Sequence, residues 1–219
     1  YMLMDAPPEK EDCALFVSID EFFDKNGVRV PHIVAKDLTL GLLLLEDFGD
    51  VVLSTLLTDE TVDQYYAQSF EQLIELQQID GLKQLPAYSY EKLMTEMRLL
   101  TEWMLPSLDI QPTEQQLETI EQAFDFLAVE ATHQPQVIVH RDFHSRNLMK
   151  IENEQALGVI DFQDAVIGAD TYDLISITRD AYVQWNADRV YGWFKVFYDL
   201  LPETAKENRN FEQFKRDAD

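Results

Sequence analysis

A polar segment framed by short apolar runs constrains the fold of this chain more than any other feature. Residues 140–147 read H-R-D-F-H-S-R-N, and I-D-F follows at residues 160–162. The apolar run at 137–139 predicts a short buried strand, and the runs at 148–151 and 157–160 predict two more, with a polar turn at Asn153 between them. Because a hairpin brings its two ends together, we expect Asn147 to lie beside Asp161.

The polar residues of these motifs suit phosphoryl transfer on Mg²⁺. A phosphoryl group in flight carries charge on its oxygens, so the protein mainly positions the reactants and supplies cations. Mg²⁺ prefers oxygen ligands and takes few of them from protein, which fits the amide oxygen of Asn147 and the carboxylate of Asp161. The carboxylate of Asp142 can accept a hydrogen bond from an attacking hydroxyl and orient it. We therefore predict that Asp142 is catalytic and that Asn147 and Asp161 bind the metal.

Other kinds of site fit the same residues less well. His140 and His144 are possible zinc ligands, but no cysteine pair or H-E-x-x-H helix accompanies them. Ser145 lacks the G-x-S-x-G turn that exposes a nucleophilic serine in hydrolases. A loop carboxylate such as Asp161 is often only solvated, yet its place directly after an apolar strand favours the metal role.

The H-x-D-x-H-x-x-N pattern with a downstream I-D-F resembles the aminoglycoside phosphotransferase and choline kinase branch of the protein-kinase-like fold. His144 stands where protein kinases usually have a lysine, as is usual for these small-molecule kinases. The motif Y-D-L at residues 172–174 also matches this branch, in which the aspartate, here Asp173, supports the catalytic loop. We expect His140 to brace that loop, His144 to orient backbone or substrate, and Arg146 to lie near the sugar or its carboxylate.

Three segments are similar to a smaller group within this branch, the bacterial anomeric kinases of N-acetylmuramate and N-acetylglucosamine that act in cell-wall recycling. They are residues 3–12, 140–149 and 161–166. The resemblance implies ATP and Mg²⁺ as cofactors, a small-molecule amino sugar as substrate and a cytoplasmic enzyme. Aminoglycosides, choline and homoserine stay open as acceptors, and so does a nucleotide-binding pseudokinase.

The resemblance also implies an α+β fold of two lobes, with an incomplete small lobe at residues 1–46 and a mainly helical large lobe at residues 47–219. The segment E-D-F-G that starts at Glu46 corresponds to the hinge between the lobes. In this fold adenine bonds to backbone groups of the hinge, here the C=O of Glu46 and the N–H of Phe48. The small lobe is expected to contain four elements. They are a strand at residues 3–4, a helix at about 9–25, and strands at 33–35 and 42–45.

Two features that hold nucleotide phosphates in this branch are missing from the chain. No Gly-rich phosphate loop is present, and in the family the strand pair that carries it would precede Tyr1. The usual phosphate-binding lysine is absent from residues 3–5, and Lys10 lies at the start of the expected helix. We therefore expect the small lobe to be incomplete, with arginines before Tyr1 as one candidate for neutralising the phosphates.

Apolar residues at helical spacing predict that the large lobe is mostly helical. Three such faces occupy residues 62–74, 93–104 and 117–131. Thr113 with Gln116 three residues later is a capping-box signal for the third helix. Aromatic residues are frequent in the last segment, and they fit a helical core better than a platform for stacking a sugar. They are Tyr182, Trp185, Tyr191, Trp193, Phe194 and Phe197.

Composition excludes several classes of protein. The formal net charge is −24, and such a surface repels nucleic acids and anionic membranes. The charge would steer cationic substrates, but the acidic residues are spread along the chain, which favours a role in solubility. The single cysteine, Cys13, allows no internal disulfide and suits a reducing cytoplasm. No apolar run approaches the ~20 residues of a membrane span, and nothing resembles a signal peptide.

Overall fold

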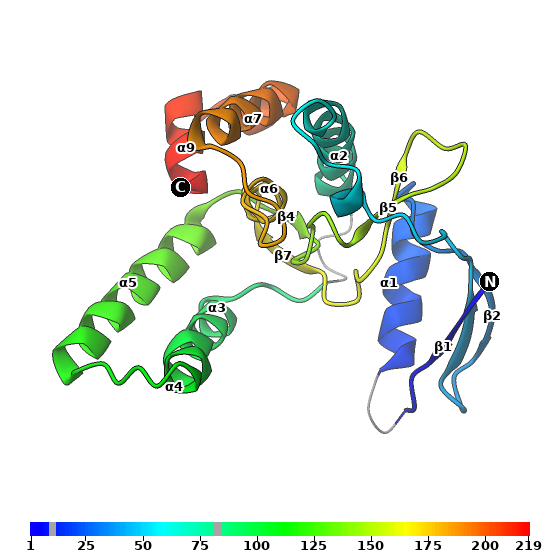
Figure 1. Cartoon of the computed structure of the whole chain (residues 1–219), viewed down its shortest axis with the longest axis horizontal. Coiled ribbons are helices and arrows are strands. Elements are labelled where there is room, and N and C mark those ends of the chain that lie inside the picture. The colour runs from blue at the N-terminus through cyan, green and yellow to red at the C-terminus, as the bar shows by residue number, and fades with distance from the viewer. Residues whose placement is uncertain (9–11, 81–84) are drawn as a thin grey trace.

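The computed structural model describes residues 1–8, 12–80 and 85–219, and its strands form three antiparallel units (Figure 1). The first is a three-stranded sheet in the order β1 (Met2–Asp5), β3 (Leu42–Leu45) and β2 (Ile33–Asp37). The other two are the pairs β4 (Gln136–Val139) with β7 (Val166–Ala169) and β5 (Leu148–Lys150) with β6 (Leu157–Val159). The expected strands are thus confirmed, while β7 is an element that the sequence pattern did not indicate.

Helices supply most of the remaining described structure. They are α1 (Cys13–Lys25), α2 (Val62–Gln77), α3 (Tyr90–Leu99), α4 (Leu105–Ser107), α5 (Glu114–His133), α6 (Tyr172–Thr178), α7 (Ala187–Leu200), α8 (Glu203–Lys206) and α9 (Phe211–Ala218), with a 3₁₀ turn at Leu53–Thr55 and a π-helical turn at Leu100–Met104. None of the helices in the described ranges combines the length and apolarity that crossing a membrane requires.

Helix α1 lies beside the three-stranded sheet and joins it to the rest of the molecule (Figure 1). Its first described turn is capped by Asp12, whose side chain accepts the N–H of Leu15, and Gly27 with φ of +87° follows its end. Residues 9–11, which include Lys10, lie outside the described residues. The predicted apolar stripe is buried, and the ring of Phe16 lies 5.0 Å from that of Phe162. Helix α1 therefore packs directly on the segment that follows Asp161.

An aromatic cluster between α2 and α7 forms much of the core after residue 46. The ring of Tyr66 lies 4.6 Å from that of Trp193, and the ring of Phe70 lies 5.7 Å from that of Phe197. These four side chains and Phe194 are buried, and Trp185 and Tyr191 are partly buried against the same core. The expected core role is thus confirmed for five of the six aromatic residues near the end of the chain. Tyr182 departs from that expectation, because it is 47% exposed on the connection between α6 and α7.

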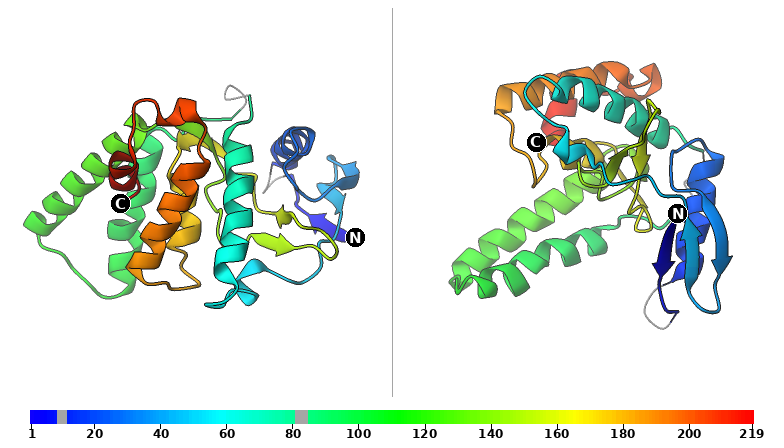
Figure 2. Two further views of the ribbon diagram at one scale, coloured as in Figure 1. Left: turned by 90° about the horizontal axis from the view of Figure 1, so that it is seen from above. Right: turned by 45° about the vertical axis from the view of Figure 1, so that its right-hand side comes forward.

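Helices α3 and α5 lie side by side and project away from α1 and the three-stranded sheet (Figure 2). The capping box of Thr113 and Gln116 is confirmed at the start of α5. The predicted apolar faces are only partly correct, since Met104 is 55% and Leu127 is 51% exposed. The π-helical turn after Leu99 explains the first departure: i→i+5 bonding rotates the following side chains away from a stripe of 3.6-residue period.

Candidate active site

The hairpin of β5 and β6 brings two of the predicted site residues together. Leu148 pairs with Val159 in the ladder, and the N–H of Ile160 donates to the C=O of Asn147 at 3.0 Å. At the open end, the Asn147 amide nitrogen donates to Asp161 Oδ2 at 3.2 Å. The expected juxtaposition of Asn147 and Asp161 is therefore confirmed by the geometry.

Asp142 lies against the same pair. Its backbone C=O accepts a hydrogen bond from the Asn147 amide nitrogen at 3.0 Å and another from the N–H of His144 at 2.9 Å. The side chain is half-buried, and burial together with the nearby charge of Asp161 raises the pKa of its carboxyl. A carboxylate with a raised pKa is a better proton acceptor than a fully solvated one.

His140 connects the loop of Asp142 with the strand end of Asp161. Its ring is fully buried, with Nδ1 accepting the N–H of Asp142 at 3.3 Å and Nε2 donating to the C=O of Ile160 at 3.1 Å. Burial lowers the pKa of His140 to about 4, so the ring is neutral near pH 7. A neutral ring with one donor and one acceptor matches both of its partners.

Asp173 binds the backbone at the start of the loop that carries Asp142. Its two carboxylate oxygens accept the N–H of His140 at 2.7 Å and the N–H of Arg141 at 3.0 Å. Burial raises the pKa of Asp173 to about 7. The hydrogen bonds from the two backbone N–H groups lower this pKa, but their effect is smaller than that of burial. Arg141 and Asp161 have positive φ angles of 78° and 67°, an uncommon conformation for residues other than glycine. The contacts of Asp173 fix the first of these strained residues.

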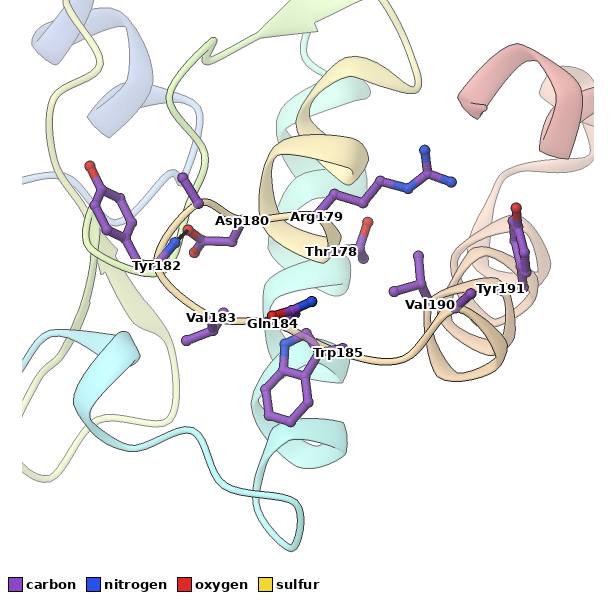
Figure 3. Close-up of a pocket in the computed structure, with 11 residues that line it drawn as sticks. Thr178, Arg179, Asp180, Tyr182, Val183, Gln184, Trp185, Val190 and Tyr191 are labelled. Carbon is purple, nitrogen blue, oxygen red and sulfur yellow. Dashed lines mark hydrogen bonds between the residues drawn. The ribbon is translucent and has the colours of Figure 1, made fainter. Parts of the chain in front are cut away.

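A cavity of about 660 Å³ is lined by the last residue of α6, the α6–α7 connection and the start of α7 (Figure 3). Asp180 anchors the connection: one carboxylate oxygen accepts the N–H of Ser145 and the other that of Tyr182, both at 2.8 Å. The Tyr182 ring lies 5.2 Å from the ring of His144 and 3.9 Å from the guanidinium carbon of Arg146. Sequence reasoning placed Tyr182 in the core and did not select Asp180.

The hinge segment is fixed by one arginine from the α1–β2 connection. Arg29 donates to both carboxylate oxygens of Glu46, at 2.6 and 2.8 Å, and to both of Glu154, at 2.9 Å each. These bonds from Arg29 lower the pKa of Glu46. The guanidinium also lies 4.6 Å from the centroid of the Phe48 ring. Nothing in the sequence near Arg29 signals this role.

Phe48 occupies the space over Gly158 in β6. A Cβ atom at residue 158 would stand 2.4 Å from the Phe48 ring, so only glycine fits there. The ring is buried together with Met149 and Ile151 of the catalytic hairpin. Phe48 of the predicted hinge is therefore packed on the hairpin whose open end carries Asn147 and Asp161.

The residues at the hairpin end fit a magnesium ion. The amide nitrogen of Asn147 donates hydrogen bonds to the C=O of Asp142 and to Asp161. Its amide oxygen is therefore the atom available to bind a metal ion. Asp161 is exposed, and one of its oxygens accepts a hydrogen bond from Gln163 at 2.8 Å. Two oxygen donors of this kind suit Mg²⁺, which keeps several waters and takes its other ligands from nucleotide phosphates.

Asn147 and Asp161 lie together at the open end of one hairpin, with Asp142 beside them, as the phosphotransferase motifs of the sequence predict. Residues 1–207 match the sequence profile of the phosphotransferase enzyme family, and the chain belongs to that family. The resemblance that the motifs indicated is confirmed. The roles of the individual site residues remain predictions.

Two bacterial proteins are similar to the whole chain. They are the N-acetylmuramate/N-acetylglucosamine kinases of Pseudomonas putida, 35% identical over 221 residues, and Pseudomonas aeruginosa, 36% identical over 224 residues. Each match covers 100% of this chain, whereas the chain spans only 65% and 64% of the length of these relatives.

Solved structures confirm the fold. An ADP-bound aminoglycoside phosphotransferase superposes with a TM-score of 0.61 at 17% identity, over 94% of this chain and 79% of that one. The ethanolamine kinase of Plasmodium vivax gives a TM-score of 0.66 at 14% identity, over 94% of this chain and 61% of that one. The predicted α+β, protein-kinase-like fold is therefore correct.

Proposed function

We propose that the protein is an ATP-dependent cytoplasmic kinase that phosphorylates the anomeric hydroxyl of N-acetylmuramate or N-acetylglucosamine, as a step of cell-wall recycling. The observation that carries the reaction type is the placement of Asn147 and Asp161 together at the hairpin end, next to Asp142. The choice of acceptor is supported by the two relatives named N-acetylmuramate/N-acetylglucosamine kinase, whose matches cover 100% of this chain.

In this proposal Asp142 orients the acceptor. Its carboxylate accepts a hydrogen bond from the anomeric hydroxyl, so that the hydroxyl oxygen faces the γ-phosphorus of ATP. A bond forms between that oxygen and phosphorus while the bond from phosphorus to the β–γ bridging oxygen breaks. The hydroxyl proton passes to Asp142 and then to solvent. The raised pKa of Asp142 favours this transfer.

Asn147 and Asp161 would hold Mg²⁺ through the amide oxygen and the carboxylate. When bound, the ion neutralises charge that develops on the phosphate oxygens. His140 and Asp173 contribute indirectly, because their hydrogen bonds fix the backbone of Asp142 and the strand end before Asp161. His144 is assigned a supporting role, with its ring edge-on to Tyr182.

The nucleotide base is assigned to the hinge. We place the lobe boundary there, with residues 1–46 as the small lobe and residues 47–219 as the large lobe. The C=O of Glu46 and the N–H of Phe48 would bind adenine. Support comes from the packing of Phe48 on Gly158 and from the clamp that Arg29 forms on the Glu46 side chain.

A cationic acceptor is the second candidate, because a net charge of −24 attracts cations over long range. The discriminating comparison is kcat/KM for N-acetylmuramate, N-acetylglucosamine, kanamycin and choline with Mg²⁺ and ATP at two salt concentrations. We expect turnover of the amino sugars and a product whose phosphate is released by mild acid, since an anomeric phosphate is acid-labile. Preference for kanamycin or choline, or an acid-stable product, would overturn the proposal.

A further inference from the structure

Arg146 differs from the other arginines near the site in having no acidic partner. The guanidinium groups of Arg29, Arg141 and Arg189 are each bound to carboxylates. Within residues 1–8, 12–80 and 85–219, Arg146 forms no ion pair and is exposed, with its guanidinium stacked on the Tyr182 ring. In a chain with 41 acidic and 17 basic residues, a guanidinium without an acidic partner is available to bind an anion.

The backbone on both sides of the Arg146–Tyr182 contact is held by Asp180. Asp180 is buried, and its carboxylate bridges the backbone N–H groups of Ser145 and Tyr182. One carboxylate therefore holds the backbone of the residue before Arg146 and the backbone of Tyr182, on whose ring Arg146 stacks. Holding a guanidinium in place before binding reduces the entropy that a ligand must lose on its arrival.

Arg146 lies between the loop of Asp142 and a residue of the cavity wall. It directly precedes Asn147 in the catalytic loop, and Tyr182 lines the cavity of about 660 Å³ (Figure 3). This cavity belongs to the α6–α7 connection and α7, whereas the hinge is formed by residues that pack on β5 and β6. The guanidinium therefore lies against Tyr182, a residue of the cavity wall, and not against the residues that pack around Phe48.

We infer that Arg146, stacked on Tyr182, is a subsite for the carboxylate of the acceptor sugar, an inference that rests on the proposed function. N-acetylmuramate carries a lactyl carboxylate that N-acetylglucosamine lacks, and the two sugars are otherwise alike. The planar guanidinium binds a carboxylate with two parallel hydrogen bonds, which a hydroxyl at the same place cannot accept equally well. Arg146 thus sets the preference between the two acceptors.

The test is the ratio of kcat/KM for N-acetylmuramate to that for N-acetylglucosamine in the wild type and in Arg146→Gln, Arg146→Lys and Tyr182→Leu. We expect Arg146→Gln to lower this ratio by about tenfold or more, since it removes a charge-assisted pair. Arg146→Lys keeps the charge but loses the planar guanidinium that donates two parallel hydrogen bonds. Its ratio should therefore lie between that of the wild type and that of Arg146→Gln. Tyr182→Leu should lower the ratio as well, because it removes the stacking surface. Arg98→Gln on α3, whose partner is Glu121, serves as the matched control and should leave the ratio unchanged.

Other outcomes contradict the inference in different ways. An equal loss with both sugars and a raised KM for ATP would assign Arg146 to a nucleotide phosphate. A ratio that stays at the wild-type value in Arg146→Gln would show that no carboxylate is bound there. A wild-type enzyme that phosphorylates neither sugar would overturn the proposed function, and this inference with it. Melting temperatures of all variants identify any loss caused by misfolding.

Discussion

The buried ring of His140 donates a hydrogen bond to the backbone carbonyl of Ile160 at 3.1 Å. Its other nitrogen accepts the N–H of Asp142, so a single neutral side chain joins the loop of the predicted catalytic residue to the strand end of a predicted metal ligand. Protonation of the ring would place a second N–H against that of Asp142 and break this connection. Proton uptake by His140 therefore opposes the active arrangement.

This predicts a specific dependence of stability on pH. The folded pKa of His140 is about 4, below the ordinary value of 6.5, so the unfolded chain binds more protons between these two values. The stabilisation is fully present above about pH 6.5 and is lost as the pH falls through about 4. Over that window the loss is on the order of 3 kcal/mol.

The measurement is the free energy of unfolding of the wild type and of His140→Gln between pH 4 and pH 7, without metal or nucleotide. Asp20 and Asp173 have pKa values raised to about 7 by burial, so their contributions change in the opposite direction over the same window. Because both carboxyl groups are present in each protein, the difference between the two proteins isolates His140. We expect that difference to shrink with acidification, and a difference that does not depend on pH would refute the prediction.

Removal of the Asp161 carboxylate is expected to weaken binding of the Mg²⁺–nucleotide complex. Asp161→Ala leaves Asn147 without the second predicted metal ligand, and we expect affinity to fall at least about tenfold. Glu152→Ala, an exposed carboxylate in the turn of the same hairpin, is the control and should bind normally. Calorimetric titration with Mg²⁺ and a non-hydrolysable ATP analogue measures both. Equal affinities in the two variants would remove Asp161 from the metal site.

Loss of Arg29 is expected to affect nucleotide binding more than turnover. Arg29→Gln removes the charged contacts to Glu46 and Glu154, so the hinge backbone is held less firmly and KM for ATP should rise while kcat changes less. The cost in stability is about 1 kcal/mol, since the three side chains are partly exposed. Arg98→Gln removes a comparable pair with Glu121 on α3 and α5, away from the hinge. A rise in KM for ATP that is the same in both variants would contradict a role of the Arg29 contacts in nucleotide binding.

Local sequence signals predicted the parts of the structure that local physics determines. The alternation of short apolar runs and polar turns was sufficient to place Asn147 beside Asp161, because a hairpin joins residues close in sequence. The capping box of α5 was also readable, since both of its partners lie within one turn. The spacing of Phe16, Ile19 and Phe23 revealed the buried face of α1.

Contacts between distant residues were not predictable in this way. Arg29 and Glu154 are 125 positions apart, and neither belongs to a motif. The pairing of β7 with β4 joins residues 136–139 to 166–169, so no hairpin signal marks it. Tyr182 carries the same aromatic signal as Trp193, and only the packing of α2 on α7 separates the exposed ring from the buried one.

The most direct test of the account is the turnover of Asp142→Asn. An amide in place of the carboxylate cannot take up the hydroxyl proton, and such contacts contribute ~10²–10⁴-fold to the rate. We expect kcat with N-acetylmuramate to fall by that factor, while the melting temperature and the affinity for Mg²⁺–nucleotide stay close to those of the wild type. A variant that retains more than about a tenth of the wild-type rate would contradict the assignment of Asp142 and the proposed mechanism.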